Sequence, residues 1–257
     1  MRWLGRLIIL AVFVFLFAPM AMIVAFSFFE DSYLVFPPSG WTTKWYAWAL
    51  DRSEFLDGLR TSVELAISAT AISSALAVPA ALAIGKGRFR GRAAIESILI
   101  SPILIPTIIL GIALLVYFSA LGLRVGFHTL LIGHVVVVTP FIIRNVLVSV
   151  AGLPPHVEEA ALGLGATPWR VFRRVVLPLI YPGIVAGAIL AFLISLDELA
   201  MTVFLTSPTV VTLPVRIFNY VEWHLDPGVA ALSTLLIGFT TVLLVILERL
   251  RRSDGLL

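Results

Sequence analysis

The chain has 257 residues, of which 60% are hydrophobic and only 13% are charged, and its formal net charge is +3. Soluble domains carry about 25% charged residues, so this composition excludes an ordinary soluble protein and indicates a chain that lies in a lipid bilayer. Cysteine is absent, which excludes disulfides and thiolate metal sites.

Six apolar runs are each long enough to cross about 30 Å of hydrocarbon as a helix. They lie at about residues 7–29, 65–84, 98–120, 130–151, 179–205 and 229–247. The first run is longer than the core of a cleavable signal, so we expect a retained helix. The sequence predicts an all-α membrane protein with six transmembrane helices, one domain over residues 1–257, and both termini on the same side.

Lysine and arginine in the short connections predict the orientation, because positive charge is retained on the cytoplasmic face during insertion. The termini and the connections after the second and fourth runs carry twelve of them: Arg2, Arg6, Lys86, Arg88, Arg90, Arg92, Arg170, Arg173, Arg174, Arg249, Arg251 and Arg252. We read the basic run that contains Lys86 as a topology signal. The distribution predicts cytoplasmic termini and an acidic outer mouth, which would attract cations.

The outer segment after the first run is rich in amphipathic aromatic residues. Trp41, Trp45, Tyr46 and Trp48 lie within residues 30–57. Such residues are typical of the headgroup zone, so an interfacial belt is one interpretation. A docking surface for an external partner is the other.

The second run is distinguished by small residues and the third run by two prolines. The second run is rich in Ala, Ser and Thr on almost all sides, and small residues let helices approach closely in lipid, so we expect it inside the bundle. The third run contains Pro102 and Pro106. Proline removes backbone hydrogen bonds, which predicts a kink in this span.

The connection between the fourth and fifth runs reads GLPPHVEEAALGLGATPWRVFRRVVLP over residues 152–178. Pro154 and Pro155 suit the start of a short helix, while Gly163 and Gly165 suit its end. Acidic residues in the first turn complement the positive end of the helix dipole. The first half of the connection is therefore predicted as a short helix followed by a glycine turn.

A second short helix is predicted to follow the turn. Thr167 suits its cap and Pro168 its first turn, and we expect it to end at Pro178. Trp169 lies on its apolar face and Arg170 on its basic face. Taken alone, these faces suit either lipid headgroups or the groove of a partner protein.

The spacing within this connection resembles the signature of the permease subunits of type I ABC importers. That signature is Glu-Ala-Ala, three residues, Gly, nine residues, an apolar residue, any residue, and Leu-Pro. Its matches here are Glu159, Ala160, Ala161, Gly165, Val175, Leu177 and Pro178. The resemblance covers nearly the whole chain and implies the MetI-like permease fold, with this connection as the coupling loop that enters a cleft of a cytoplasmic ATPase.

The resemblance also implies site residues and partners. The predicted ATPase-coupling residues are Glu158, Glu159, Ala160, Ala161, Gly165, Pro168, Leu177 and Pro178. The chain would be half of a pathway in the bacterial inner membrane, paired with a second and different permease. Two ATPase subunits would bind ATP and Mg²⁺ below the pair, and an extracytoplasmic binding protein would deliver the cargo. No cofactor, metal, nucleic acid or catalytic residue is expected for this chain itself.

Two carboxylates interrupt the fifth run. Asp197 and Glu198 would lie about 27–29 Å along a helix from Leu179, near the outer edge of the hydrocarbon. Ionisable groups there are costly unless they face water, a partner or a substrate. They are either interfacial carboxylates or a cation site near the outer end of the pathway. Successive residues point about 100° apart, so we expect only one of them to face the pathway.

Residues 195–237 resemble the spermidine/putrescine subclass of these permeases. The resemblance rests on the acidic pair, on Thr206 with Pro208, and on Leu213 with Pro214. It implies a polyamine substrate. Glu198 stands where an Asp is common in the subclass.

Polyamines are polycations, so carboxylates and aromatic faces are the expected recognition groups. Tyr220, Trp223 and Tyr117 are aromatic candidates, with packing or interfacial roles as the alternative for each. His134 is expected to be a packing histidine within the fourth run.

Other functions remain as alternatives. Related permeases move ferric iron, phosphonates, opines or amino-acid derivatives, and the binding protein selects most of the cargo. An autonomous secondary transporter would show paired broken helices in an inverted repeat, and we find no such pattern. An intramembrane metalloenzyme would need spacing such as H-E-x-x-H, which the sequence lacks.

Overall fold

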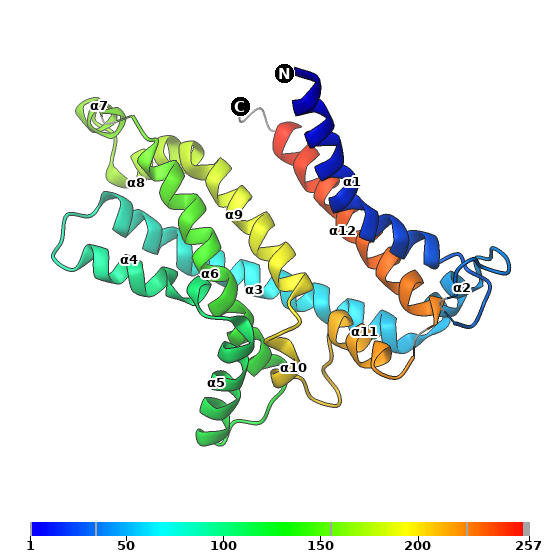
Figure 1. Cartoon of the computed structure of the whole chain (residues 1–257). Coiled ribbons are helices and arrows are strands. Elements are labelled where there is room, and N and C mark those ends of the chain that lie inside the picture. Colours follow the sequence, from blue (N-terminus) through cyan, green and yellow to red (C-terminus); the bar gives the residue numbers. More distant parts are fainter. Residues whose placement is uncertain (1, 34, 155, 225, 254–257) are drawn as a thin grey trace. The chain divides into compact units, whose positions relative to one another are not determined.

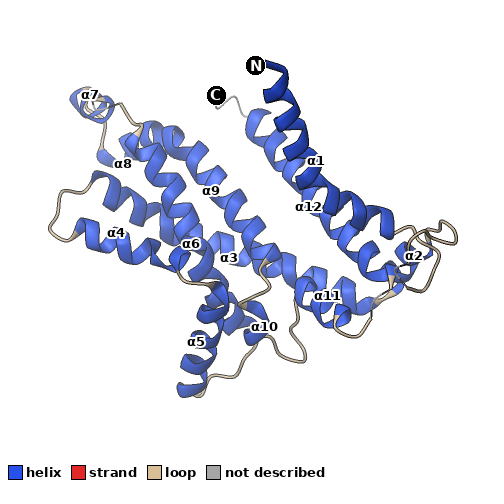
Figure 2. Ribbon diagram, in the orientation of Figure 1, coloured by secondary structure: helices blue, strands red, loops and turns tan. Residues whose placement is uncertain are grey.

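A computed structural model describes residues 2–33, 35–154, 156–224 and 226–253 of the chain, and helix dominates this part (Figure 1 and Figure 2). Within it, five helices are long and apolar enough to cross a membrane, and one bent pair supplies a sixth span if it is counted as one. The all-α membrane class predicted from the sequence is confirmed.

The helices follow the apolar runs in chain order, with additional short helices in the connections. Their bounds are α1 (Arg2–Phe26), α2 (Lys44–Asp51), α3 (Ser53–Lys86), α4 (Arg92–Ile100), the 3₁₀ turn η1 (Ser101–Leu104), α5 (Thr107–Ala120), α6 (Phe127–Ala151), α7 (Val157–Gly163), α8 (Pro168–Val171), the π-helical turn η2 (Phe172–Val176), α9 (Leu177–Asp197), α10 (Thr202–Leu205), α11 (Leu213–Val221) and α12 (Pro227–Ser253).

The chain forms two compact units. One consists of Met1–Leu59 with Leu213–Leu243, and the other of Arg60–Thr212 with Leu244–Leu257. In the first unit, Phe55 and Leu213 belong to a small apolar core against which Trp48 packs. The prediction of one transmembrane domain stays a prediction.

The core of the second unit is built around α6 and α9, which pack along each other (Figure 1). Glycines of α9 allow this approach. A Cβ atom at Gly183 would lie 2.7 Å from the carbonyl oxygen of Asn145, and one at Gly187 would lie 2.9 Å from the Cα of Ile142. Small residues thus bring the two backbones close enough for van der Waals contact, as helices in lipid require.

Helix α3 contributes its alanine face to this core. Ala69, Ala77 and Ala81 are fully buried, whereas Ile67 and Leu76 on other faces are exposed. Ala71, Ala75 and Ala83 are also exposed. The prediction that this helix lies inside the bundle therefore holds for one face of α3 and is wrong for the others within this chain.

Two predicted spans are not continuous helices. The third run is divided into α4 with η1 and α5, which are bent by 104° relative to each other. The backbone of Ile105 is extended, and Pro106 follows it. The proline ring clashes with the preceding residue when that residue is helical, so the helix stops here. The predicted interruption at the prolines is present, but the bend of 104° is much larger than a kink within one helix.

The fifth run was also predicted as one span over 179–205, and this was wrong. Helix α9 ends at Asp197, the backbone of Glu198 is extended, and α10 begins at Thr202. The break occurs where the carboxylates interrupt the apolar run, because the Glu198 side chain bonds to the backbone of the next turn.

Candidate functional site

The first half of the 152–178 connection is a short helix that ends in a left-handed glycine. Helix α7 covers Val157–Gly163, and Pro155 lies outside the described residues. Gly165 has φ of +82°, a conformation that glycine adopts without steric penalty. Its N–H donates to the Leu162 carbonyl oxygen at 2.9 Å, and the Ala166 N–H donates to the Ala161 carbonyl oxygen at 3.2 Å. This pair of bonds is a Schellman motif, which confirms the predicted glycine turn.

The second half begins as predicted but does not end at Pro178. The Thr167 hydroxyl accepts the Arg170 N–H at 3.4 Å, and Pro168 occupies the first turn. The helix then runs without interruption through η2 and α9 for 30 residues. Proline is tolerated there because the wider turn η2 precedes it and Pro178 lies in the first turn of α9. The connection is thus a hook that is continuous with the fifth span.

The tip of this hook is exposed. Leu164 is 89% exposed and Trp169 is 68% exposed. The Glu159 carboxylate is also exposed, and it lies 3.3 Å from the Nδ1 of His156. Ala161 and Ala166, by contrast, pack partly against the core of the second unit. The hook therefore presents apolar and acidic side chains outward on a short base, an arrangement suited to a cleft in a partner protein.

The two carboxylates at the end of α9 have different environments. The Glu198 Oε1 accepts the N–H of Met201 at 2.9 Å, which caps the turn before α10. Asp197 is exposed at the last position of α9. Glu198 therefore has a structural bond, while Asp197 is the carboxylate available to a cation.

A buried histidine holds this break in place. The Nδ1 of His134 lies 2.8 Å from the Ser195 hydroxyl, and its Nε2 lies 3.0 Å from the Thr202 hydroxyl. His134 is in α6, Ser195 in α9 and Thr202 in α10. Both ring nitrogens thus have hydroxyl partners, so the expected packing role of His134 is confirmed.

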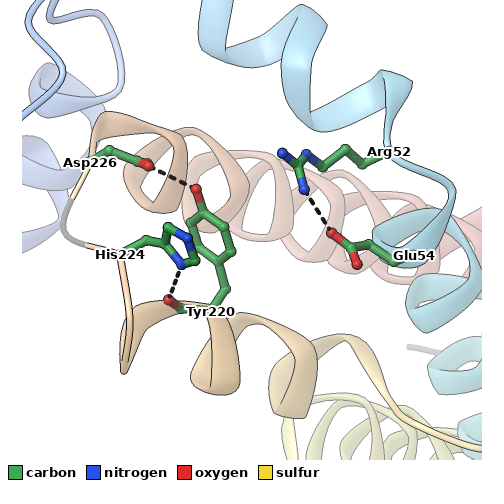
Figure 3. Close-up of polar contacts among 5 residues, drawn as sticks. All are labelled: Arg52, Glu54, Tyr220, His224 and Asp226. Atoms are coloured by element: carbon green, nitrogen blue, oxygen red, sulfur yellow. Dashed lines mark hydrogen bonds and ion pairs between the residues drawn. The ribbon is translucent and has the colours of Figure 1, made fainter.

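The predicted aromatic residues Tyr220 and Trp223 belong to the other unit. Figure 3 shows Tyr220 with its neighbours Asp226 and His224. The Tyr220 hydroxyl donates to Asp226 Oδ2 at 2.7 Å, and its ring stacks on His224 with centroids 4.3 Å apart. Burial and, after it, the Asp226 hydrogen bond raise the pKa of Tyr220 above its ordinary value. Tyr220 is therefore held by packing.

The remaining aromatic candidates are exposed. Trp223 lies largely outside any core, and Tyr117 touches the ring of Phe118 in α5. Asp197 and Glu198 belong to one unit, and Tyr220 and Trp223 to the other. Contacts within either unit do not bring these four residues together, so a joint substrate site remains a prediction.

Comparisons with known proteins identify the family of the chain. Residues 77–253 match the family described as binding-protein-dependent transport system inner membrane component. The chain belongs to this family. It is a permease subunit of an ATP-binding-cassette importer, and a multi-pass inner membrane protein.

Two relatives support the same conclusion, and a solved structure shares the fold. The permease is 35% identical to the putrescine transport system permease protein PotI of Escherichia coli (strain K12), over 91% of this chain and 85% of that protein. It is 30% identical to the spermidine/putrescine transport system permease protein PotC of the same strain, over 97% and 96%. A bacterial ABC transporter involved in alginate import has the same fold, with a TM-score of 0.72 at 17% identity, covering 98% of this chain and 96% of that chain.

Some residues of the permease could not be identified from the sequence. Lys86 was interpreted only as a topology signal, but it forms an ion pair with Glu158. Ser195 and Thr202 were not predicted as partners of His134. Polar residues inside an apolar run are a signal that each needs a partner, but which partner each finds depends on how distant helices pack.

Proposed function

We propose that this permease imports a polyamine, driven by a separate ATPase that binds the hook formed by α7 and α8. The observation that carries the proposal is the exposed hook itself. It bears Glu159 and Gly165 at the spacing of the coupling signature and continues into α9. A rigid element of this kind can transmit the closure of the ATPase to the spans.

The substrate class is supported by the two relatives and by Asp197. The names of both relatives include putrescine, and a carboxylate is the natural partner of an ammonium group. In this proposal Asp197 attracts the cation near the outer end of the path. Tyr220, whose hydroxyl donates to Asp226, and Trp223 remain candidate aromatic faces for the cargo in this proposal.

The assembly follows from the same proposal. The permease pairs with a second, different permease chain, two ATPase subunits bind below the pair, and an extracytoplasmic binding protein delivers the cargo. ATP and Mg²⁺ bind to the ATPase. The ATPase-coupling residues are those of the hook: Glu158, Glu159, Ala160, Ala161, Gly165, Pro168, Leu177 and Pro178.

The first test reverses the charge at the tip of the hook. In the complete transporter, Glu159→Lys should lower ATP-dependent putrescine uptake about tenfold or more, because an unpaired charge would face the docking cleft. Membrane insertion should be unchanged. Arg249→Glu, a charge reversal near the end of α12, is the control and should keep uptake near wild type. Normal uptake by the Glu159→Lys transporter would contradict the docking role.

The second test separates the two carboxylates. Asp197→Asn should lower putrescine uptake about tenfold, because a charged hydrogen bond to the cation is lost. Glu198→Gln should change uptake by about twofold or less, because the amide oxygen still accepts the Met201 N–H. Binding of the ATPase, measured by co-purification, should be the same in both. Equal loss of uptake and ATPase binding in Asp197→Asn would indicate a folding defect and contradict the substrate role.

A further inference from the structure

The inner end of α3 lies against the base of the hook. A Cβ atom at Gly85 would lie 2.5 Å from Cγ1 of Val150, near the end of α6. Ile84 is 2% exposed. The last turn of α3 is therefore packed tightly against α6, just before the chain enters the hook.

Lys86, the last residue of α3, extends this contact to α7. Its ammonium group forms an ion pair with the Glu158 carboxylate, and the two residues are 72 positions apart. Their side chains are 33% and 40% exposed, whereas those of the Arg60 and Glu64 pair within α3 are 79% and 53% exposed. Partial enclosure reduces the screening of such a pair by salt.

Apart from its contacts with α8 and η2 in the same hook, helix α7 has sparse apolar packing. It contains no buried residue, and Ala161 is its partly buried contact with the core of the second unit. A helix of seven residues is too short to be stable in isolation, so it depends on contacts with the rest of the protein. Apolar packing usually supplies these contacts and sets the orientation of the helix. Where such packing is sparse, a polar contact has a larger share in setting the orientation.

We propose that Lys86 is a positioning residue for ATPase coupling, and that its ion pair with Glu158 fixes α7 to the end of α3. This inference rests on the proposed function of the hook. Displacement of α7 by the ATPase then reaches α3 as well as the continuous helix from α8 to α9. The two adjacent carboxylates have different roles in this proposal. Glu158 binds Lys86 and fixes α7 to α3, and the exposed Glu159 binds the ATPase.

The test is a charge exchange in the reconstituted complete transporter. Lys86→Glu and Glu158→Lys should each lower the amount of putrescine imported per ATP hydrolysed by about fivefold, because each replaces an attraction by a repulsion. The double variant, Lys86→Glu with Glu158→Lys, should restore the ratio to within about twofold of wild type. Lys86→Arg should keep the ratio near wild type, since it preserves the charge.

Two further measurements complete the design. Arg90 lies in the same cytoplasmic connection and is exposed, and the structure describes no ion pair for it. Arg90→Glu is therefore the matched charge reversal and should leave the ratio unchanged. Co-purification of the ATPase should be the same for the Lys86 and Arg90 variants, because Lys86 acts through α7 and not by touching the ATPase.

The outcomes separate this inference from the proposed function. A double variant that is as impaired as the single variants overturns the role of Lys86. Loss of the ATPase from the Glu158→Lys transporter also overturns it, since Glu158 would then contact the ATPase directly. If Glu159→Lys abolishes uptake while Lys86→Glu behaves as wild type, the inference about Lys86 fails and the proposed function stands. If Glu159→Lys transports normally, the proposed function fails.

Discussion

At the residue scale, the backbone of Gly165 explains why glycine stands at this position of the 152–178 connection. Its φ of +82° lies in the left-handed region, and a Cβ atom there would meet nothing within 4 Å. The requirement is therefore conformational and not steric. Spacing alone placed the turn correctly, because a left-handed residue after a short helix is a local property of the backbone.

Two glycines two positions apart allow a controlled comparison. Gly165→Ala should destabilise the end of α7 by about 1 kcal/mol, which raises the amide hydrogen exchange of α7 about fivefold. Gly163→Ala, in the last turn of α7 with open space around it, should leave this exchange unchanged or lower it, because alanine favours helix. Equal exchange rates in the two variants would contradict the role of the left-handed conformation.

At the scale of elements, the break between α9 and α10 depends on close packing with two other helices. A Cβ atom at Gly111 of α5 would lie 2.9 Å from the Cα of Met201, and one at Gly133 of α6 would lie 3.0 Å from its sulfur. Met201 is fully buried. Met201, which lies in the break, therefore packs against Gly111 and Gly133. His134 forms hydrogen bonds to α9 before the break and to α10 after it.

This packing predicts a large effect of one methyl group. Gly111→Ala should lower the free energy of unfolding by about 1–3 kcal/mol, because the backbone of Met201 must move to admit the new atom. Gly238→Ala in α12 meets nothing within 4 Å and should be neutral or slightly stabilising. Thermal unfolding of the purified proteins in detergent measures both. Equal midpoints for the two variants would show that the contact at Met201 does not constrain the fold.

At the scale of the whole molecule, the distribution of positive charge predicts that the termini and the hook are cytoplasmic. This orientation places the exposed tip at Glu159, Leu164 and Trp169 where an ATPase could reach it. It places Asp197 toward the outer side, about 27 Å along the helix from Leu179. The direction of import that we propose depends on this assignment.

The absence of cysteine makes the orientation directly testable. A membrane-impermeant maleimide added to intact spheroplasts should label Ser32→Cys, which is exposed after α1. It should label Arg90→Cys only after permeabilisation, because that position follows α3 on the predicted inner side. Labelling of Arg90→Cys from outside would reverse the topology and exclude a cytoplasmic hook.

The sequence by itself determined the membrane class, the approximate spans and the glycine turn at Gly165. These depend on properties that are local in the chain: continuous hydrophobicity, proline and glycine at fixed positions, and charge near the ends of spans. The proline pair also indicated correctly that the third run is interrupted. It did not indicate a bend of 104°, since the angle depends on what the two segments pack against.

Only the tertiary structure decided which polar groups bond to each other. It assigned Glu198 to the Met201 amide, His134 to two hydroxyls, and Lys86 to Glu158, and it showed that the hook continues into α9 without a stop at Pro178. The physical reason is that buried or enclosed polar groups must find partners. In this protein most of those partners lie on helices far apart in the sequence, so only the packing of those helices brings them within bonding distance.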